Sequence, residues 1–598
     1  MSTTMHMDRA DKNKVGTAEI EDLRVIPVIF LPGIMGTNLK VKPKDDGEDS
    51  IAVWRYDSKT SLLGWTLPSS GPKERKRLLH PDRVKIDNRG LIPMSPDVQK
   101  YIDLVIATQY PSNIADKEEM ERFTKALLKA EEEDHPEKKL FGSRRDRGWG
   151  EVAAPSYGAF LDALQTALYR DKPTKKDNTL SAIYQKLVDE PLGLEFGVDS
   201  LDETYLEVMK LYQFPVHVVG YNWLGSNILS AKRLGEEVDR IIDKYQTQGM
   251  KCSKVILVTH SMGGLVARYY SECLEGRDKI YGIVHGVMPS VGAAATYTRM
   301  KRGTENTESG LAGAVGYLTS HILGRNAAEM VAIGSQSSGA LELLPANDYG
   351  DDWLKIVDRD GSTLTLPRDL PVGEDDKKEN CLYNGLYLNR DKWWKLMDEN
   401  LLNPFNTTLN KEQIESDWQK YKKLIDRDVK ALHKQLLDKY HLQTYLFYGK
   451  SKGGELPAAY RTQETAVWSG ALASGQIGQT PPAPKMNDER LYLSEIGADR
   501  TVMDELSPEE QAWTFKGDNN VVYGWVGQRF TLRDACENGD GTVPLRAGQI
   551  VHKNIRERLA VQVLHEAAYR DTLSQAFVLR SIIKIAQQVN NDKEMVFA

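Results

Sequence analysis

This sequence of 598 residues has few cysteines. It also has no excess of basic charge and no long apolar run. The four cysteines are scattered and form no Cys-x-x-Cys pair, so neither a disulfide framework nor a cysteine zinc site is predicted. No uninterrupted apolar run approaches the roughly 18 residues of a membrane-spanning helix. Lys and Arg number 78 against 85 Asp and Glu, for a net charge of −7. That balance argues against nucleic acid as a partner.

The first residues also lack the apolar core of a secretory signal, since they are polar and charged. Residues 1–24 are therefore expected to be a flexible tail. The chain is expected to be made in the cytoplasm, and any export would use a route that needs no such signal.

Six short apolar runs predict β-strands of the kind that is buried on both faces of a parallel sheet. Three long segments with apolar residues at steps of three and four predict helices between them. This alternation predicts an α/β fold with a mostly parallel sheet. The strands are expected at 25–31, 216–221, 254–259, 280–284, 444–448 and 559–564, and the helices at 227–247, 263–274 and 566–590.

Long insertions separate these strands. Because structureless loops above roughly 15 residues are uncommon in compact domains, we expect the insertions to be lids or subdomains. The Gly/Ala-rich stretch 311–318 is a candidate mobile lid over an apolar groove. The predicted core comprises 25–39, 213–287, 441–449 and 534–598; the insertions are 40–212, 288–440 as a partly helical cap or lid, and 450–533 near the acid loop introduced below.

A serine stands between a predicted strand and a predicted helix, in Thr259-His260-Ser261-Met262-Gly263-Gly264. This is the context of a nucleophile elbow, the Gly-x-Ser-x-Gly turn of α/β-hydrolases. The helix N-terminus there directs its dipole and free N–H groups at a forming oxyanion. Ser261 is the predicted nucleophile, although an ordinary strand–helix turn is the alternative. Thr259 replaces the first glycine, and its branched side chain is expected to crowd the elbow.

An acid and a histidine follow in the order of the hydrolase fold. Asp540 lies between two glycines, and His565 ends the last predicted strand. We expect Ser261 to attack an acyl carbonyl, His565 to take its proton and return it to the leaving alcohol, and Asp540 to hold the imidazole. A plain Gly-Asp-Gly turn and a core histidine are the alternatives. His552 competes as base but precedes the last strand.

The turn Pro32-Gly33-Ile34-Met35-Gly36 follows the first strand, where a hydrolase places one oxyanion donor. The predicted donors are the backbone N–H groups of Met35 and Met262. Gly33, His260 and Tyr221 are predicted to contact the substrate. No cofactor or metal is predicted, but a structural divalent cation such as calcium stays open at the acidic pairs Asp351-Asp352 and Asp375-Asp376.

Taken together, these motifs resemble a lipase branch that contains lecithin–cholesterol acyltransferase and the PGAP1-like inositol deacylases. The resemblance rests on the oxyanion turn, Tyr221-Asn222-Trp223, the Ser261 elbow and Gly539-Asp540-Gly541-Thr542-Val543-Pro544. It implies an α/β-hydrolase fold and a serine esterase. Size, insertions and the lack of a signal resemble the bacterial type VI secretion phospholipase effectors.

That second resemblance implies a phospholipase A or lipase that acts as an antibacterial toxin. Its expected partners are a phospholipid membrane surface, a cognate immunity protein and a secretion spike protein, and its expected place of action is the membrane or periplasm of a target cell. The alternatives are an acyltransferase or glycolipid deacylase with the same triad, and a non-catalytic lipid-binding protein.

Overall fold

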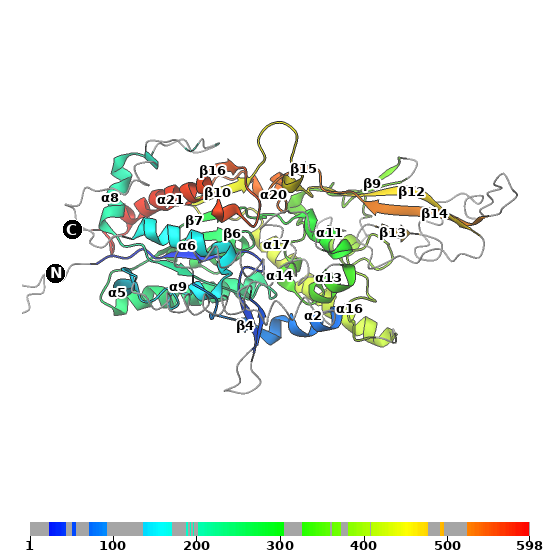
Figure 1. Cartoon of the computed structure of the whole chain (residues 1–598), viewed down its shortest axis with the longest axis horizontal. Coiled ribbons are helices and arrows are strands. Elements are labelled where there is room, and N and C mark those ends of the chain that lie inside the picture. Colours follow the sequence, from blue (N-terminus) through cyan, green and yellow to red (C-terminus); the bar gives the residue numbers. More distant parts are fainter. Residues whose placement is uncertain are drawn as a thin grey trace, which may run out of the picture.

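The computed structural model describes residues 23–42, 51–55, 71–92, 135–169, 187–188, 192, 195, 201–303, 324, 326–358, 361–371, 381–406, 408, 410–476, 491–494 and 523–596. The molecule is elongated, with a parallel sheet toward one end and a second sheet reaching to the other (Figure 1). The predicted lid stretch 311–318 lies outside the described residues.

The parallel sheet contains all the strands predicted from apolar runs. Its order is β16-β10-β7-β6-β1-β5, and every neighbouring pair is parallel. The prediction of an α/β fold with a mostly parallel sheet is thereby confirmed. The strands are β1 (Val28–Leu31), β5 (Val216–Val218), β6 (Val255–His260), β7 (Ile280–Gly286), β10 (Thr444–Gly449) and β16 (Ile555–Val561).

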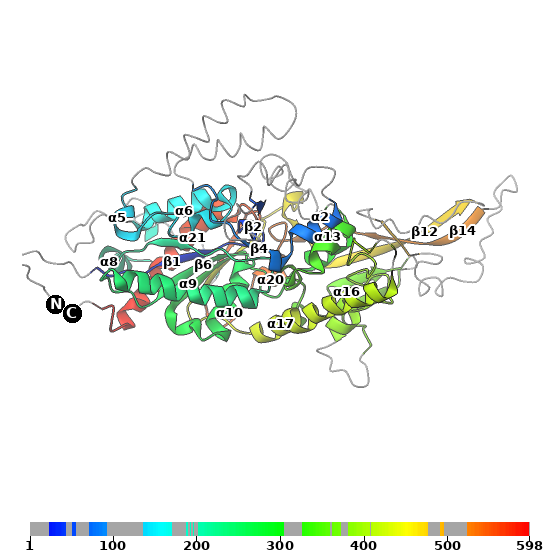
Figure 2. The same cartoon turned by 90° about the horizontal axis from the view of Figure 1, so that it is seen from below.

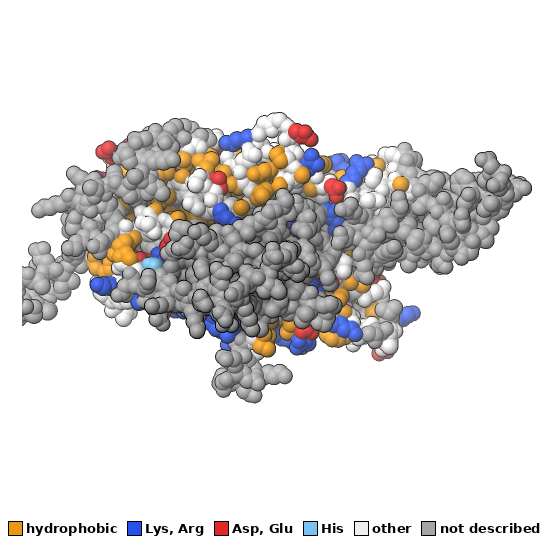
Figure 3. All heavy atoms as spheres, viewed as in Figure 1, with side chains coloured by type: hydrophobic (Ala, Val, Ile, Leu, Met, Phe, Trp, Pro, Cys, Tyr) orange, Lys and Arg blue, Asp and Glu red, His pale blue; other side chains and the backbone are white. Residues whose placement is uncertain are grey.

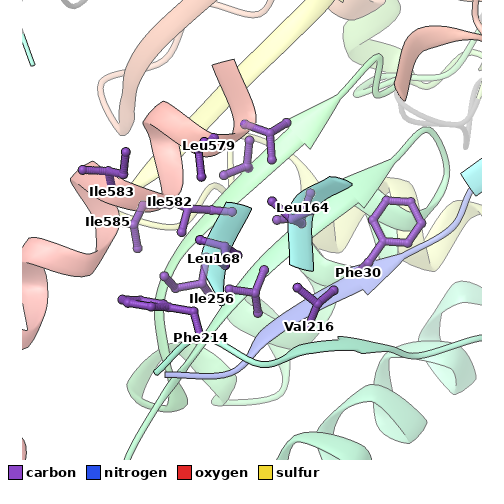
Figure 4. Close-up of a cluster of buried hydrophobic side chains, with 14 of the residues drawn as sticks. Phe30, Leu164, Leu168, Phe214, Val216, Ile256, Leu579, Ile582, Ile583 and Ile585 are labelled. Atoms are coloured by element: carbon purple, nitrogen blue, oxygen red, sulfur yellow. The ribbon is translucent and has the colours of Figure 1, made fainter. Parts of the chain in front are cut away.

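Helices cover both faces of this sheet, and β1 shows how the sequence achieves it. Val28 and Phe30 belong to the core under α6 (Ala154–Leu168) and α21 (Thr572–Ala586) (Figure 4). Ile29 and Leu31, which alternate with them, pack toward α9 (Asn227–Thr247) and α10 (Gly263–Cys273) on the other side (Figure 2). Each fully buried Leu or Ile side chain contributes roughly 1.5–3 kcal/mol.

The first insertion completes this core. Its helix α6 buries Tyr157, Phe160, Leu161 and Leu164 against the sheet. The insertion also forms a small sheet of order β3-β2-β4 beside the oxyanion turn. Its other described elements are β2 (Leu39–Val41), β3 (Ala52–Trp54), α2 (Pro72–Leu78), η1 (Pro81–Arg83), β4 (Val84–Ile86), α5 (Lys138–Phe141), η2 (Trp149–Glu151) and α8 (Glu203–Leu211).

The second and third insertions build one structure together. Their strands form a single sheet of order β13-β14-β12-β8-β9. Strand β12 pairs in parallel with β8, which precedes it by more than a hundred residues in the chain, and antiparallel with β14. The strands are β8 (Leu354–Val357), β9 (Thr363–Leu366), β12 (Ala466–Gln476), β13 (Leu491–Ser494) and β14 (Tyr523–Leu532).

Helices of the same two insertions pack around a separate apolar cluster that includes Tyr297, Trp353 and Trp468. They are α11 (Ala294–Arg302), α13 (Ala327–Gly334), α14 (Ser338–Leu341), α16 (Lys411–Leu424) and a π-helical turn (Ile425–Val429). The next helix, α17 (Lys430–Leu436), packs against α10 instead. Shorter elements are the 3-10 turns η3 (Gly276–Lys279), η4 (Asn347–Tyr349), η7 (Ala458–Tyr460), η8 (Ala568–Arg570) and η9 (Gln587–Asn591), the π-helical turn η5 (Tyr383–Tyr387), the strands β11 (Arg461–Thr462) and β15 (Glu537–Asn538), and α20 (Leu545–Gly548).

The end of the predicted tail is held by the core. Arg24 is buried, and its guanidinium donates a hydrogen bond of 2.5 Å to the carbonyl of Met595. The backbone of residues 23 and 24 pairs with Lys251 and Gln213. The described chain begins at residue 23, inside the range 1–24, and its first residues are paired with the core. Within the described residues, no helix has the length and apolar character needed to cross a membrane.

Candidate active site

Ser261 lies in a strained turn at the carboxyl end of the central strand β6. Its φ of 52° is in the left-handed region that residues with a Cβ rarely adopt, and α10 starts two residues later. A Cβ on Gly263 would lie 2.5 Å from the carbonyl oxygen of Pro32, so only glycine lets the helix start this close to the oxyanion turn. This is the geometry of a nucleophile elbow.

Thr259 fits this elbow without distortion. It pairs in register with Leu31 of β1 and His285 of β7. Its hydroxyl lies 2.8 Å from Nδ1 of His285, and its carbonyl accepts a 2.7 Å hydrogen bond from the hydroxyl of Tyr569. The expectation that Thr259 crowds the elbow is wrong, because a polar partner on the next strand accommodates its side chain.

His565 bridges Ser261 and Asp540, as the chain order of these residues led us to expect. Its Nε2 lies 2.9 Å from Oγ of Ser261, and its Nδ1 lies 2.8 Å from Oδ2 of Asp540. A carboxylate only accepts hydrogen bonds, so Nδ1 carries the proton and Nε2 is left to accept from the serine. All three side chains are buried. The structure thus brings together the three residues that the sequence predicts as nucleophile, base and orienting acid.

Asp540 is itself held firmly by backbone groups. Its Oδ1 accepts hydrogen bonds from the N–H groups of Thr542 at 2.9 Å and Val543 at 2.6 Å. Its carbonyl accepts a 2.9 Å bond from the N–H of His565. The next residue, Gly541, donates its N–H to the hydroxyl of Thr462 at 3.0 Å, which ties the acid loop to the third insertion.

Charge around His565 favours its protonated form. Burial of the ring opposes that form, but the Asp540 carboxylate outweighs it, through both its charge and its hydrogen bond, and the pKa of His565 is raised. Glu566 adds to this rise and Arg299 opposes it. A raised pKa makes His565 a stronger base for the serine proton.

The two predicted oxyanion donors are both unused. Among the described residues, no hydrogen bond occupies the backbone N–H of Met35 or Met262. Met35 has a φ of 65°, and its carbonyl accepts a 2.6 Å bond from the indole of Trp54, which holds the peptide that follows Met35. Met262 immediately precedes α10, so its N–H belongs to the positive end of that helix. Both groups are available to an oxyanion.

Two of the predicted substrate contacts lie in a chain of hydrogen bonds beneath the site. Gly33 donates its N–H to the hydroxyl of Tyr157 at 3.1 Å, and that hydroxyl lies 2.8 Å from Nδ1 of His260. Nε2 of His260 donates to the carbonyl of His565 at 3.0 Å. Burial lowers the pKa of His260 to about 3, so the ring stays neutral and can serve both partners. Neither ring nitrogen of His260 is left for a substrate.

Tyr221, the third predicted contact, also lies below the site. It is buried, and its hydroxyl donates a 2.8 Å bond to the carbonyl of Pro32. Its N–H donates to the hydroxyl of Thr37 at 3.1 Å. The structure places His260 and Tyr221 as supports of the oxyanion turn, whereas a Cβ on Gly33 would lie 3.0 Å from Cβ of Ser261, beside the nucleophile itself.

One charged residue beside the triad was not predicted from the sequence. Arg299 of α11 is partly buried and donates a 3.3 Å hydrogen bond to the hydroxyl of Thr542. It forms no ion pair with any described carboxylate. Burial lowers the pKa of Arg299, against the charges of Glu566 and Asp540 nearby. No local motif marks this residue; only the packing of the cap helix on the acid loop reveals it.

The other sequence candidates lie elsewhere. His552 is separated from the triad by the length of β16 and has its Nε2 3.4 Å from Oδ1 of Asp438. Asp352 forms an ion pair of 2.7 Å with Arg546, while Asp375 and Asp376 lie outside the described residues. Within the described part of the chain, no group of three or more His, Cys, Asp or Glu is arranged to hold a metal ion.

Comparisons with known proteins agree with this geometry. Residues 225–299, which include the elbow, match the model of the PGAP1-like alpha/beta domain. The crystal structure of the Tle4–Tli4 complex contains a chain that is similar over 94% of this chain and 99% of its own length, with 26% identity and a TM-score of 0.64. No curated protein gave a significant match. The resemblance stated from the motifs is thereby confirmed, and the fold is that of an α/β-hydrolase.

Proposed function

We propose that this protein is a serine carboxylic-ester hydrolase. The observation that carries the proposal is the continuous relay from Ser261 through His565 to Asp540, with distances of 2.9 and 2.8 Å. Ser261 attacks an acyl carbonyl while His565 takes its proton, and the N–H groups of Met35 and Met262 stabilise the oxyanion. His565 then protonates the leaving alcohol, and water releases the acid in a second round.

We infer further that the substrate is a membrane phospholipid. The leaving alcohol departs on the side of His565, and in a phospholipid it carries a phosphodiester only a few bonds away. Arg299 lies on this same side, beside Thr542, and no carboxylate of the described residues is bound to it. Arginine suits phosphate because its planar fork donates two parallel hydrogen bonds. The buried triad favours a site that opens only at a lipid surface.

We propose in addition that the protein is a secreted antibacterial effector, with a cognate immunity protein and a secretion spike protein as partners. The similarity to the Tle4 chain, which was solved in a complex with Tli4, supports the effector role and the inhibitor. Tle4 was crystallised with Tli4, and we propose an equivalent inhibitor for this chain. Co-expression of the proposed inhibitor should restore growth to cells that export the enzyme to the periplasm. Unimpaired growth of those cells without the inhibitor would contradict the toxin role.

Ser261→Ala tests the core of the proposal. The variant should fold normally and release no fatty acid from phospholipid vesicles, while the unaltered chain does, as measured by mass spectrometry of the products. If the variant releases fatty acid at the same rate as the unaltered chain, Ser261 is not the nucleophile. Adding an alcohol acceptor separates hydrolysis from acyl transfer, since a transferase would yield a new ester.

A further inference from the structure

A cavity lies apart from the triad and is lined by residues of α2, of the turn η1 and of α16. Figure 1 shows α2 and α16 close to each other. Its volume is about 620 Å³, and none of Ser261, Asp540 or His565 lines it. Its walls come from the first insertion, from the start of α9 and from the cap helices. The cavity is therefore a site separate from the ester-cleaving one.

Basic side chains outnumber acidic ones in the lining of this cavity. Six are Lys or Arg and three are Asp, in a chain whose overall charge is −7. Two of the acids are neutralised on their own helices, because Asp417 accepts from Lys420 at 2.9 Å and Asp428 pairs with Arg427 at 2.6 Å. The third, Asp82, has a side chain 90% exposed to water, which screens its charge.

Three cations of the cavity form no ion pair with a carboxylate of the described residues: Lys76, Arg83 and Lys423. Lys76 is half-buried, and its ammonium donates a 2.7 Å bond to the hydroxyl of Ser335. Burial lowers the pKa of Lys76 to about 8, with the Asp417 charge opposing the fall. An anion in the cavity would stabilise the charged form of this ammonium.

Exposed apolar side chains stand among these cations. Leu229 is 62% exposed and Phe405 is 52% exposed, and both line the cavity. Figure 3 shows Lys and Arg side chains, mixed with apolar and some acidic ones, along the lower edge of the molecule, where Figure 1 places α2 and α16. Basic groups combined with exposed aromatic and aliphatic side chains are typical of protein surfaces that enter the headgroup layer of a bilayer.

We propose that this basic pocket, defined by Lys76, Arg83 and Lys423, binds the phosphate-bearing headgroup of an anionic phospholipid in the membrane that the enzyme attacks. The proposal rests on the proposed function for its choice of a lipid source. A chain with a net charge of −7 is repelled by an anionic bilayer, so a local cationic site would set which face meets the membrane.

The pocket is linked to the catalytic edge through one short segment. Gly225 and Ser226 line the pocket, and Tyr221, four residues before Gly225, donates its hydroxyl to Pro32 of the oxyanion turn. Asn222 in between donates its amide to the carbonyl of Pro81 at 2.8 Å, beside Arg83. A headgroup held in the pocket thus keeps the oxyanion side of the enzyme close to the lipid surface.

The test measures binding in the Ser261→Ala chain, which leaves the vesicles intact. Flotation is compared with vesicles of phosphatidylcholine alone and with vesicles that contain about one-third phosphatidylglycerol. We expect tighter binding to the anionic vesicles, and at least a tenfold loss of that binding on adding Arg83→Glu and Lys423→Glu. The matched control adds Lys139→Glu and Lys553→Glu, two exposed lysines away from the pocket, and should retain binding.

Equal losses in the pocket variant and the control would overturn the proposal, because charge alone would then account for the binding. A second outcome would also overturn it: the Ser261→Ala chain binds inorganic phosphate, and the pocket variant loses this binding while its vesicle binding is unchanged. The pocket would then be a site for a free anion. If the pocket variant no longer binds a protein inhibitor but binds vesicles as before, the pocket is the binding site of that inhibitor.

Two further variants protect the test against misfolding and against a failure of the proposed function. If thermal unfolding shows that the charge reversals do not fold, Arg83→Gln with Lys423→Gln should give a smaller loss of anionic binding in the same direction. Lys76→Met, inside the cavity, should also weaken binding. Failure of the unaltered enzyme to release fatty acid would leave these binding results standing, so the two proposals fail separately.

Discussion

Arg299→Gln separates recognition of phosphate from the chemistry of ester cleavage. Glutamine keeps a polar side chain that can reach Thr542 but removes the charge beside the leaving-group side of His565. The variant should therefore bind a phospholipid poorly and leave a neutral ester almost unaffected. A merely structural arginine would harm both substrates alike.

The size of the effect follows from the proposed contact. A hydrogen bond to a charged group contributes about 1.5–3 kcal/mol, and a factor of ten in rate corresponds to roughly 1.4 kcal/mol. Because Arg299 is only partly buried, water screens the contact and the lower part of that range applies. We expect kcat/KM for phospholipid to fall about 10- to 30-fold, mainly through KM.

The assay compares one phospholipid and one uncharged glycerol ester in the same detergent micelles, so that the interface is constant. The pH profile gives a second readout. Arg299 lowers the pKa of His565, so its removal should move the acidic limb of kcat/KM to higher pH. Arg240→Gln, at an exposed position on α9, is the control for loss of one positive charge.

Equal losses on the phospholipid and the neutral ester would refute the phosphate role of Arg299. An unchanged KM for phospholipid, together with a shift of the acidic limb to higher pH, would also refute it. The guanidinium would then act only on the pKa of His565. Loss of activity in the Arg240 control would show that the assay responds to overall charge.

Other predictions concern the triad and its supports. Asp540→Asn should lower kcat by about 10⁴, and a loss below tenfold would point to another acid. The substitution should also move the acidic limb of kcat/KM to lower pH, because the carboxylate no longer raises the pKa of His565. His260→Phe keeps a ring but breaks the bonds to Tyr157 and His565, so kcat should fall about 10- to 100-fold, whereas an unaltered kcat would show that the chain beneath the site is dispensable. Burial raises the pKa of Glu342 to about 8 from 4.5, so the folded protein keeps a proton that the unfolded chain loses. The free energy of unfolding should therefore decrease as the pH rises from 4.5 to about 8. Denaturant titrations should show a weaker pH dependence for Glu342→Gln. A pH dependence unchanged by this substitution would exclude Glu342 as its source.

Local patterns in the sequence were sufficient for the central sheet and for the three residues of the relay. Strands buried on both faces are continuous apolar runs, and the elbow at Ser261 joins such a run to a helix, so both are visible in a short window. Asp540 and His565 could be proposed because the hydrolase fold orders its acid and base along the chain. The registers between strands confirm the sheet.

Contacts between segments that are far apart in the sequence could not be predicted, because a short window of sequence contains only one of the two segments. The parallel pairing of β8 with β12 joins segments more than a hundred residues apart, and no local pattern of either strand specifies the other. Tyr157 supports the oxyanion turn from an insertion that the sequence treats as peripheral. His260 and Tyr221 were expected to touch substrate, but the partners that occupy their polar atoms become visible only in three dimensions.

The acid loop is fastened to the insertion that carries the second sheet. Strand β11 pairs with β15 two residues before Asp540, and Thr462 at the end of β11 accepts the N–H of Gly541. Strand β12 begins four residues after Thr462. A force that drags β12 away from the hydrolase body would therefore pull on the carboxylate that orients the base. Displacement of Asp540 in this way would inhibit the enzyme, although no inhibitor enters the substrate site.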